Sequence, residues 1–208
     1  MKVLLVNGSP HEKGCTYTAL TEVAGALEKQ GVETEIFQLG TKPISGCHSC
    51  GSCRKTGKCF MNDIVNEFLE KASAADGFIF GTPVHFASAS GALTSFMDRV
   101  FFVGLGSGLF SYKPAAAISS ARRGGTTATF DQVNKYFTIS SMPIVSSQYW
   151  NMVHGNTPEE VQKDLEGMQI MRTLGNNMAW LIKSIEAGKA AGMALPEKET
   201  KVVTNFIR

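Results

Sequence analysis

The fold of this chain is decided by residues 2–18, which read KVLLVNGSPHEKGCTYT. The apolar residues at 3–6 form a short run with branched side chains, and a glycine and a proline follow almost at once. Such a run is typical of a strand that is buried on both faces of a sheet. Leu20, Val23 and Leu27 then recur at helical spacing. The sequence therefore predicts a strand, a tight loop and a helix that begins near residue 15.

The loop between this strand and this helix has the features of an anion site. Backbone N–H groups in the first turn of a helix lack partners within the helix, and the helix dipole favours negative charge there. Ser9, Thr16 and Thr18 add hydroxyl donors. The loop contains neither G-x-x-x-x-G-K-[ST] nor G-x-G-x-x-G, so the two common nucleotide fingerprints are excluded. A hydroxyl-rich loop of this kind suits one terminal monophosphate, and an ordinary strand-to-helix turn is the alternative.

The composition fits one domain that spans residues 1–208. Hydrophobic residues make up 43% of the chain and charged residues 18%, so a packed core is expected. The net charge of +2, with mixed signs, provides no basic stripe for nucleic acid and no polybasic segment for a membrane. No apolar stretch approaches the ~18 residues that span a bilayer, and no signal peptide is recognised. We therefore expect a cytoplasmic protein in a reducing compartment, with no nucleic-acid or membrane partner.

Apolar runs and helical periodicities alternate along the chain, without an internal repeat or a linker. Strands are predicted at residues 3–6, 32–37, 77–80, 114–119 and 143–146. A helix is predicted after each strand, and this alternation implies a five-stranded parallel sheet with helices on both faces. Ligands bind such sheets outside the carboxyl ends of the strands. The loops at 9–18, 81–88 and 119–126 leave three of these ends, so we expect the three loops to converge.

The second and third of these loops suit a flat ligand beside the phosphate. Pro83 fixes the turn, and apolar neighbours such as Val84 and Phe86 can stack against a ring. The adjacent glycines at 124–125 let the backbone approach a ligand closely. A cation or an N–H dipole near the N1–C2=O edge of a flavin stabilises its anionic reduced form. FMN has the required shape, with one phosphate, a ribityl chain and a tricyclic ring.

Three segments carry a resemblance to a known family. They are GSPHEKGCTYTAL, TPVHFASASGALTSFMDR and SSARRGGTT, in this order. Together they resemble the flavodoxin-like NAD(P)H-dependent FMN reductase family, and CHSCGSCRKTGKC, between the first two, is similar to its iron–sulfur flavoprotein branch. The resemblance covers residues 1–155 and implies a flavodoxin-like three-layer sandwich, whose five-stranded parallel sheet has the order 2-1-3-4-5.

The same resemblance implies which residues contact FMN. The phosphate contacts would come from Ser9, Cys15, Thr16 and Tyr17. The ring contacts would come from Pro83, Val84, His85 and Phe86, and from the segment that contains Ser120, Ala121, Arg122, Gly124 and Gly125. Two positions depart from the family pattern, because His11 stands where an Arg is usual and Cys15 where an Asn is usual. The backbone N–H donors survive both changes, so both residues are retained as cofactor-binding candidates.

Some of these residues have a second interpretation. Arg122 and Arg123 either meet the 2′-phosphate of NADPH or form a solvated surface pair. Cys15 either has a lowered pKa at the helix N-terminus or is a small buried side chain beside the phosphate. Tyr149 and Trp150, expected after the carboxyl end of the fifth strand, either cover the flavin or form a subunit contact.

A separate cluster of cysteines lies in a loop expected at residues 41–60. Its members, spaced C-x2-C-x2-C-x5-C, are Cys47, Cys50, Cys53 and Cys59. In a reducing compartment such a cluster favours a metal or redox site over a disulfide framework. Four thiolates suit a [4Fe–4S] cluster, which the resemblance also implies. A structural zinc ion and an empty or thiol–disulfide loop are the alternatives.

The function predicted on these grounds is that of an FMN-dependent oxidoreductase. NAD(P)H would serve as co-substrate, and a quinone, a free flavin or another small molecule would accept the electrons, with or without the cluster. Because the flavin carries the chemistry, no catalytic side chain is assigned. A non-enzymatic flavodoxin-type electron carrier and a metal or redox sensor without flavin are the alternatives. The resemblance also implies a homodimer or homotetramer.

Overall fold

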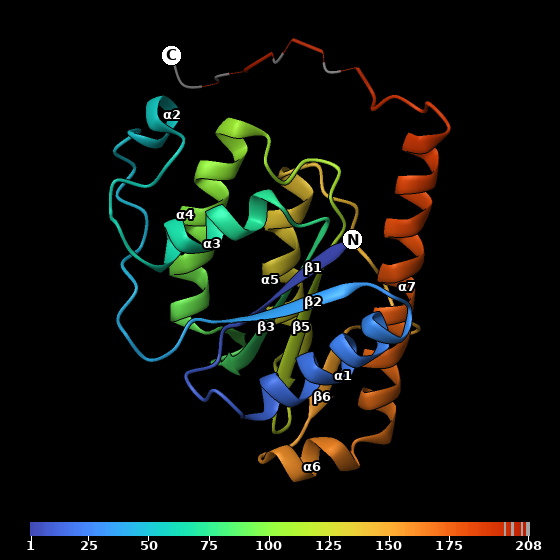
Figure 1. Ribbon diagram of the computed structural model, residues 1–208. Helices are drawn as coiled ribbons and strands as arrows, with labels where there is room; N and C mark the ends of the chain where they lie inside the picture. The colour runs from blue at the N-terminus through green and yellow to red at the C-terminus, as the bar shows by residue number, and fades with distance from the viewer. Residues whose placement is uncertain (198, 201, 205, 207–208) are drawn as a thin grey trace.

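The structure is a computed structural model, and it describes residues 1–197, 199–200, 202–204 and 206. Within these residues a six-stranded sheet forms the centre of the molecule (Figure 1). Five strands run parallel in the spatial order β2-β1-β3-β5-β6, and β4 pairs with β3 in the antiparallel sense. The strands are β1 (Lys2–Asn7), β2 (Glu33–Gln38), β3 (Gly77–His85), β4 (Ser88–Ala89), β5 (Ala115–Ala121) and β6 (Met152–His154). The predicted order 2-1-3-4-5 is confirmed for the parallel strands, and β4 is an addition.

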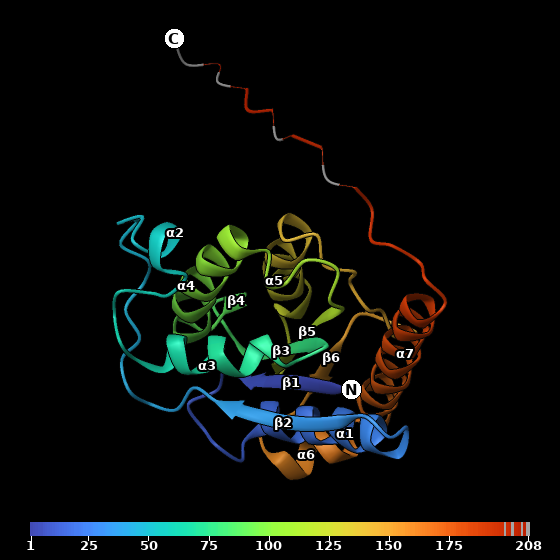
Figure 2. The ribbon, with the colours of Figure 1, turned by 45° about the horizontal axis from the view of Figure 1, so that its top comes forward.

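Helices cover both faces of the sheet and make three layers (Figure 2). The helices are α1 (Cys15–Lys29), α2 (Cys53–Thr56), α3 (Ile64–Ser73), α4 (Gly91–Ser107), α5 (Thr126–Ile139), α6 (Pro158–Lys163) and α7 (Leu165–Ala190). Helices α3, α4 and α5 lie on one face, whereas α1 and α7 lie on the other. The flavodoxin-like three-layer architecture predicted from the sequence is therefore confirmed.

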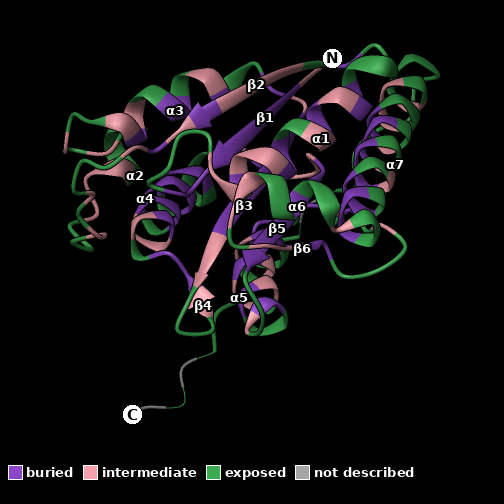
Figure 3. Cartoon of the chain, turned by 90° about the horizontal axis from the view of Figure 1, so that it is seen from below, coloured by how far each residue is buried: buried purple, intermediate pink, exposed green. Residues whose placement is uncertain are grey.

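Strand β1 is central because its side chains are apolar on both faces. Leu4 and Val6 belong to the core beneath α3, α4 and α5, whereas Val3 and Leu5 belong to the core beneath α1 and α7. None of these side chains is accessible to solvent, and Figure 3 shows the central strands buried between the helices. Complete burial of one such side chain stabilises the fold by about 1.5–3 kcal/mol. The N-terminal apolar run thus forms an internal strand of the sheet, between β2 and β3.

The two cores have different side chains. The first is rich in phenylalanine, and Phe68 contacts Phe37 and Phe96 with ring centroids 5.3 and 5.1 Å apart. The second is aliphatic and brings α1 directly against α7. Gly175 permits this approach, because a Cβ atom there would lie only 2.7 Å from the Cβ of Ala26. The long C-terminal helix thereby holds the N-terminal helix, and with it the first loop, in place.

The third strand is longer than the sequence predicts. The prediction ended it at residue 80, but β3 continues to His85. Thr82 and Pro83 pair with Ser119 and Ser120 of β5, and β4 then closes a hairpin against the end of β3. Residues 83–85 are therefore strand residues and not loop residues, and the turn itself consists of Phe86 and Ala87, whose φ angles are +53° and +56°.

The fifth strand was predicted at residues 143–146, and this position is wrong in part. Ile144 forms a single parallel bridge with Ala115, after which the chain leaves the sheet and returns as β6. The segment between Ile144 and β6 is a loop. The Ser147 hydroxyl stabilises this loop by donating to the backbone oxygen of Tyr149 at 2.7 Å. Tyr149 and its neighbour Trp150 consequently lie in a loop that interrupts the edge strand, and not beyond its carboxyl end as predicted.

No described helix combines the length and the apolar character that are needed to span a membrane.

Candidate functional site

Side-chain amides hold the first loop in its shape. The backbone N–H of Ser9 donates to Asn7 Oδ1 at 3.1 Å, and Asn7 Nδ2 donates to Gln38 Oε1 at 2.6 Å and to the Glu12 carbonyl at 3.2 Å. Gln38 Nε2 completes the ring by donating to the Ser9 carbonyl at 2.8 Å. Asn7 is fully buried. Neither amide was predicted from the sequence as part of the site. The feature of the sequence that could have identified them is a polar residue at the last position of each of two adjacent strands.

Helices α1 and α5 begin at this edge of the sheet without a side-chain cap. Their N-cap residues are Gly14 and Gly125, and neither can offer a capping oxygen from its side chain. In contrast, α4 is capped by the Ser90 hydroxyl, and α3 is capped by Asp63. Backbone N–H groups in the first turns of α1 and α5 are therefore left for another partner, and the positive ends of both helix dipoles lie at the same edge. This arrangement favours an anionic or electron-rich ligand.

The three loops predicted to converge do so through buried contacts. The Ser90 hydroxyl donates to the Gly8 carbonyl at 2.8 Å, which joins the first loop to the segment after the hairpin. The hydroxyls of Thr16 and Ser120 lie 2.8 Å apart and join the first loop to the third. A Cβ atom on Gly125 would lie 2.9 Å from both Ala87 Cα and Val84 Cγ1, so the third loop packs tightly against the hairpin. We call this region, formed by residues 8–18, 82–90 and 119–126, the cofactor edge.

The predicted cofactor-binding residues divide into a buried and an exposed group. Ser9, Thr16, Ser120 and Ala121 are buried, whereas Tyr17, Cys15, Pro83, Val84 and Gly125 are partly exposed and His11, His85, Phe86, Arg122 and Gly124 are exposed. The Ser9 Oγ accepts from the His11 N–H at 3.1 Å, which leaves the Ser9 hydroxyl hydrogen for another acceptor. The Thr16 hydroxyl is directed to Ser120, so this residue offers a ligand its backbone rather than its side chain. That these residues bind FMN stays a prediction.

Cys15 does not have the environment of a reactive thiol. Burial raises the pKa of the Cys15 thiol, and the nearby carboxylates of Glu160 and Glu159 raise it further, although the backbone N–H lowers it in part. Its sulfur lies 3.7 Å from the Gly155 carbonyl oxygen. The structure thus favours a small, packed side chain beside the loop over an activated nucleophile.

The four clustered cysteines belong to the segment between β2 and α3. Helix α2, which begins at Cys53, lies on the opposite side of α4 from the central strands of the sheet (Figure 2). All four cysteines are free thiols, and they line one common cavity together with Arg99 and Phe102 of α4. Among the residues described, no group of three or more His, Cys, Asp or Glu side chains is arranged to hold a metal ion. The sulfur set is chemically suited to iron. The four thiols thus fit an iron–sulfur cluster by their chemistry, and the presence of the cluster stays a prediction.

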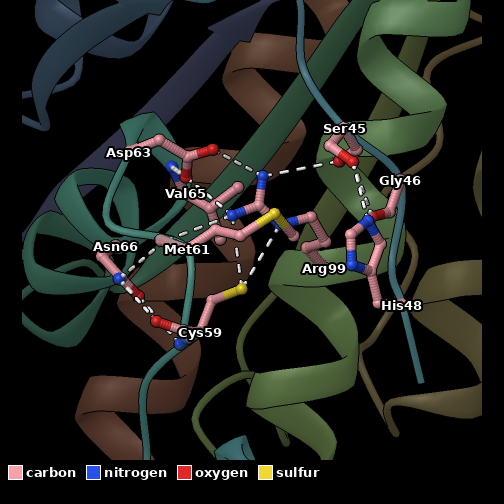
Figure 4. Close-up of polar contacts among 9 residues, drawn as sticks. All are labelled: Ser45, Gly46, His48, Cys59, Met61, Asp63, Val65, Asn66 and Arg99. Atoms are coloured by element: carbon pink, nitrogen blue, oxygen red, sulfur yellow. Dashed lines mark hydrogen bonds and ion pairs between the residues drawn. The ribbon is translucent and has the colours of Figure 1, made fainter. Parts of the chain in front are cut away.

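Arg99 connects this cavity to the body of the protein (Figure 4). Its side chain is 1% exposed, and the guanidinium donates to both carboxylate oxygens of Asp63 at 2.7 Å. Arg99 Nε and Nη2 also donate to Cys59 Sγ, at 3.4 and 3.3 Å. Burial alone would lower the pKa of Arg99, but the hydrogen bonds to Asp63 and Cys59 raise it above its ordinary value. Sequence reasoning missed Arg99; the signal was a charge within the apolar stripe of α4.

Comparison with known proteins agrees with this architecture. Residues 1–157 match the family of NADPH-dependent FMN reductases. An iron–sulfur flavoprotein from Methanocaldococcus jannaschii is 34% identical over 89% of this chain and 100% of its own length. An iron–sulfur flavoprotein from Archaeoglobus fulgidus is 28% identical over 87% of this chain and 97% of its own length.

Solved structures show the same fold. A flavodoxin, WrbA-like protein from Agrobacterium tumefaciens superimposes with a TM-score of 0.63 at 16% identity, covering 88% of this chain and 96% of that one. RosB with a bound 8-demethyl-8-formylriboflavin-5′-phosphate superimposes with a TM-score of 0.67 at 14% identity, covering 100% and 92%.

Fold, cofactor edge and relatives together define a flavoprotein oxidoreductase. The chain belongs to the NADPH-dependent FMN reductase family, as the resemblance implied, and it is an FMN-dependent oxidoreductase.

Proposed function

We propose that this protein binds FMN at the cofactor edge and uses it to pass electrons from NAD(P)H to a quinone, a free flavin or another small acceptor. The observation that carries the proposal is the convergence of three strand-end loops around two uncapped helix N-termini. Bound FMN supplies the hydride and electron chemistry. The protein contributes binding, orientation and exclusion of water.

The residues of the cofactor edge have distinct tasks in this proposal. The α1 N-terminus and the Ser9 hydroxyl would hold the phosphate, because both present hydrogen-bond donors there. The α5 N-terminus and the 122–125 backbone would face the electron-rich rim of the ring, where N–H dipoles favour the reduced, anionic form. Arg122 and Arg123 are exposed beside this segment and would meet the phosphates of the nicotinamide nucleotide.

We further propose that Cys47, Cys50, Cys53 and Cys59 hold a [4Fe–4S] cluster that exchanges single electrons with the flavin. The support is the spacing of the four thiols, the cavity that they share, and the names of the iron–sulfur flavoproteins with which the chain aligns. A zinc ion on the same thiols and a loop without metal are the competing outcomes.

We also propose a homodimer or homotetramer in the cytoplasm. Exposed apolar side chains on α7, Leu165 at 77% and Trp180 at 70%, support self-association. Free thiols throughout the described chain are consistent with a reducing compartment.

The test is purification without oxygen, followed by spectroscopy and steady-state kinetics. Flavin bands near roughly 370 and 450 nm, with rapid bleaching by NADPH or NADH and turnover with a quinone, are expected from flavin chemistry. Bound FMN without nicotinamide oxidation would instead identify an electron carrier. Failure of FMN to bind or to raise the melting temperature would contradict the proposal, and iron and sulfide analysis of the same sample decides the cluster separately.

A further inference from the structure

Cys59 differs from the other three clustered cysteines in how firmly it is held. Its backbone is clamped by Asn66, whose Oδ1 accepts from the Cys59 N–H at 2.9 Å and whose Nδ2 donates to the Cys59 carbonyl at 2.9 Å. Its sulfur accepts two N–H groups from Arg99. Backbone and side chain of Cys59 are thus both fixed, from two different helices, α3 and α4.

Within the described part of the chain, the other three sulfurs accept no hydrogen bond from α3 or α4, although Cys53, like Cys59, packs against the first core. Cys47 Sγ accepts only the N–H of Ser49, two residues away, at 3.5 Å. Cys50 is exposed, and Cys53 begins α2, a single turn without buried residues. Cys59 is therefore the member of the group whose backbone and sulfur are both hydrogen-bonded to side chains of other helices in the described structure.

Arg99 is itself held rigidly, so it can fix the position of the Cys59 sulfur. The bidentate ion pair with Asp63 fixes the plane of the guanidinium, Nη1 also donates to the Ser45 carbonyl at 3.4 Å, and the Met61 carbonyl shares an Nη2 hydrogen at 3.4 Å (Figure 4). Asp63 is in turn fixed, because it caps α3 by accepting from the Val65 N–H at 3.2 Å. The two donors that face Cys59 Sγ cannot turn away without the loss of these bonds.

We propose that Arg99 is a positioning residue that presents Cys59 as the fixed ligand of an iron–sulfur cluster and, through two N–H···S hydrogen bonds, raises the reduction potential of that cluster. This inference rests on the cluster part of the proposed function. Donors to a ligating sulfur stabilise the more negative, reduced cluster, so their presence favours reduction. The charge of the guanidinium acts in the same direction.

The experiment compares Arg99→Met with Asp63→Asn in the full-length protein after anaerobic reconstitution with iron and sulfide. Arg99→Met removes both N–H···S bonds and the ion pair. Asp63→Asn removes the ion pair alone, because Asn is also a good N-cap and the donors to Cys59 remain. Iron content, melting temperature, FMN content and the cluster potential by spectroelectrochemical titration are measured for each.

We expect Arg99→Met to shift the one-electron equilibrium toward the oxidised cluster by about tenfold, which is about 59 mV, and to lower iron retention. Asp63→Asn keeps the donors to Cys59 Sγ and removes the carboxylate that neutralises the guanidinium, so its potential is expected to be equal to or higher than that of the wild type. Equal potentials in wild type and Arg99→Met, or an equal shift in both variants, would overturn the inference. If Arg99→Met does not fold, Arg99→Lys, which keeps the charge but not the fork, must show a lower potential than Asp63→Asn.

A wild-type protein that takes up no iron and sulfide also overturns the inference. The flavin part of the proposed function is judged independently in the same sample, from its FMN content and its reduction by NADPH.

Discussion

The cofactor edge and the cysteine loop (residues 41–60), the two regions proposed to carry redox groups, are built in opposite ways. The cofactor edge consists of strand ends whose positions the sheet register determines, and its contacts are backbone groups and buried hydroxyls. The cysteine loop is a long segment between β2 and α3. Hydrogen bonds that involve Arg99, Asp63 and Asn66 connect it to α3 and α4. A site of the first kind is preorganised by the fold, whereas a site of the second kind depends on a few side chains.

The largest loss of FMN affinity, with the cysteine loop left intact, is expected for Gly125→Ala. Gly125 has a φ angle of +92°, and a Cβ atom there would lie 2.9 Å from Ala87 Cα. The strained backbone alone costs about 1–3 kcal/mol, so FMN affinity should fall about five- to a hundredfold. Fluorescence titration with FMN measures the effect.

Gly25→Ala, in α1 and outside the cofactor edge, is the control for this substitution. No atom lies within 4 Å of a Cβ atom at position 25, so FMN affinity should stay within about twofold of wild type. Equal losses in both variants would show that the packing of the third loop against the hairpin does not shape the site.

Thr16→Val tests the buried contact between the first and third loops. The substitution keeps the shape of the side chain but leaves the Ser120 hydroxyl without its partner at 2.8 Å, which costs about 1–3 kcal/mol. The melting temperature should therefore fall by several degrees. Thr21→Val, on the exposed face of the same helix, should change stability by less than about 0.5 kcal/mol. Indistinguishable melting temperatures for the two variants would mean that the contact is not stabilising.

Asn66→Ala tests the opposite region. Loss of the clamp on Cys59 frees the end of the cysteine loop, so trypsin should cleave at Arg54, Lys55 or Lys58 several times faster than in wild type. FMN affinity should not change, because the cofactor edge shares no contact with Asn66. The control is Asn62→Ala, at an exposed neighbouring position. A parallel loss of FMN affinity in Asn66→Ala would show that the two regions are one cooperative unit.

The smallest effect is expected at Glu35 of β2, outside both regions. Hydrogen bonds from Lys2 and then Lys71 lower the pKa of Glu35 from its ordinary value of 4.5. A lowered folded-state pKa contributes stability above the ordinary value, and this contribution disappears as the pH falls through the folded-state pKa. The difference in melting temperature between wild type and Glu35→Gln should be small at pH 7 and should shrink as the pH falls below 4.5 and through the folded-state pKa. A difference that grows on acidification would contradict the assignment.

The resemblance to the FMN reductase family implied the order of the parallel strands. The sequence by itself determined the alternation of strands and helices, the parallel sheet with helices on both faces and the convergence of three loops. These follow from local signals, because apolar run length, helical periodicity and loop composition are properties of short stretches. It also identified the four cysteines as a group, since their spacing alone brings them together.

Only the tertiary structure decided how the two regions are held. The hairpin extension of β3 and the interrupted edge strand depend on which neighbour each residue meets across the sheet. Asn7 lies 31 residues from Gln38 along the chain, and Arg99 lies 40 residues from Cys59. Their contacts therefore arise only once distant elements pack together. Short stretches fix the elements, but the partners of buried polar groups are fixed by packing, because each such group must find a hydrogen bond wherever the fold supplies one.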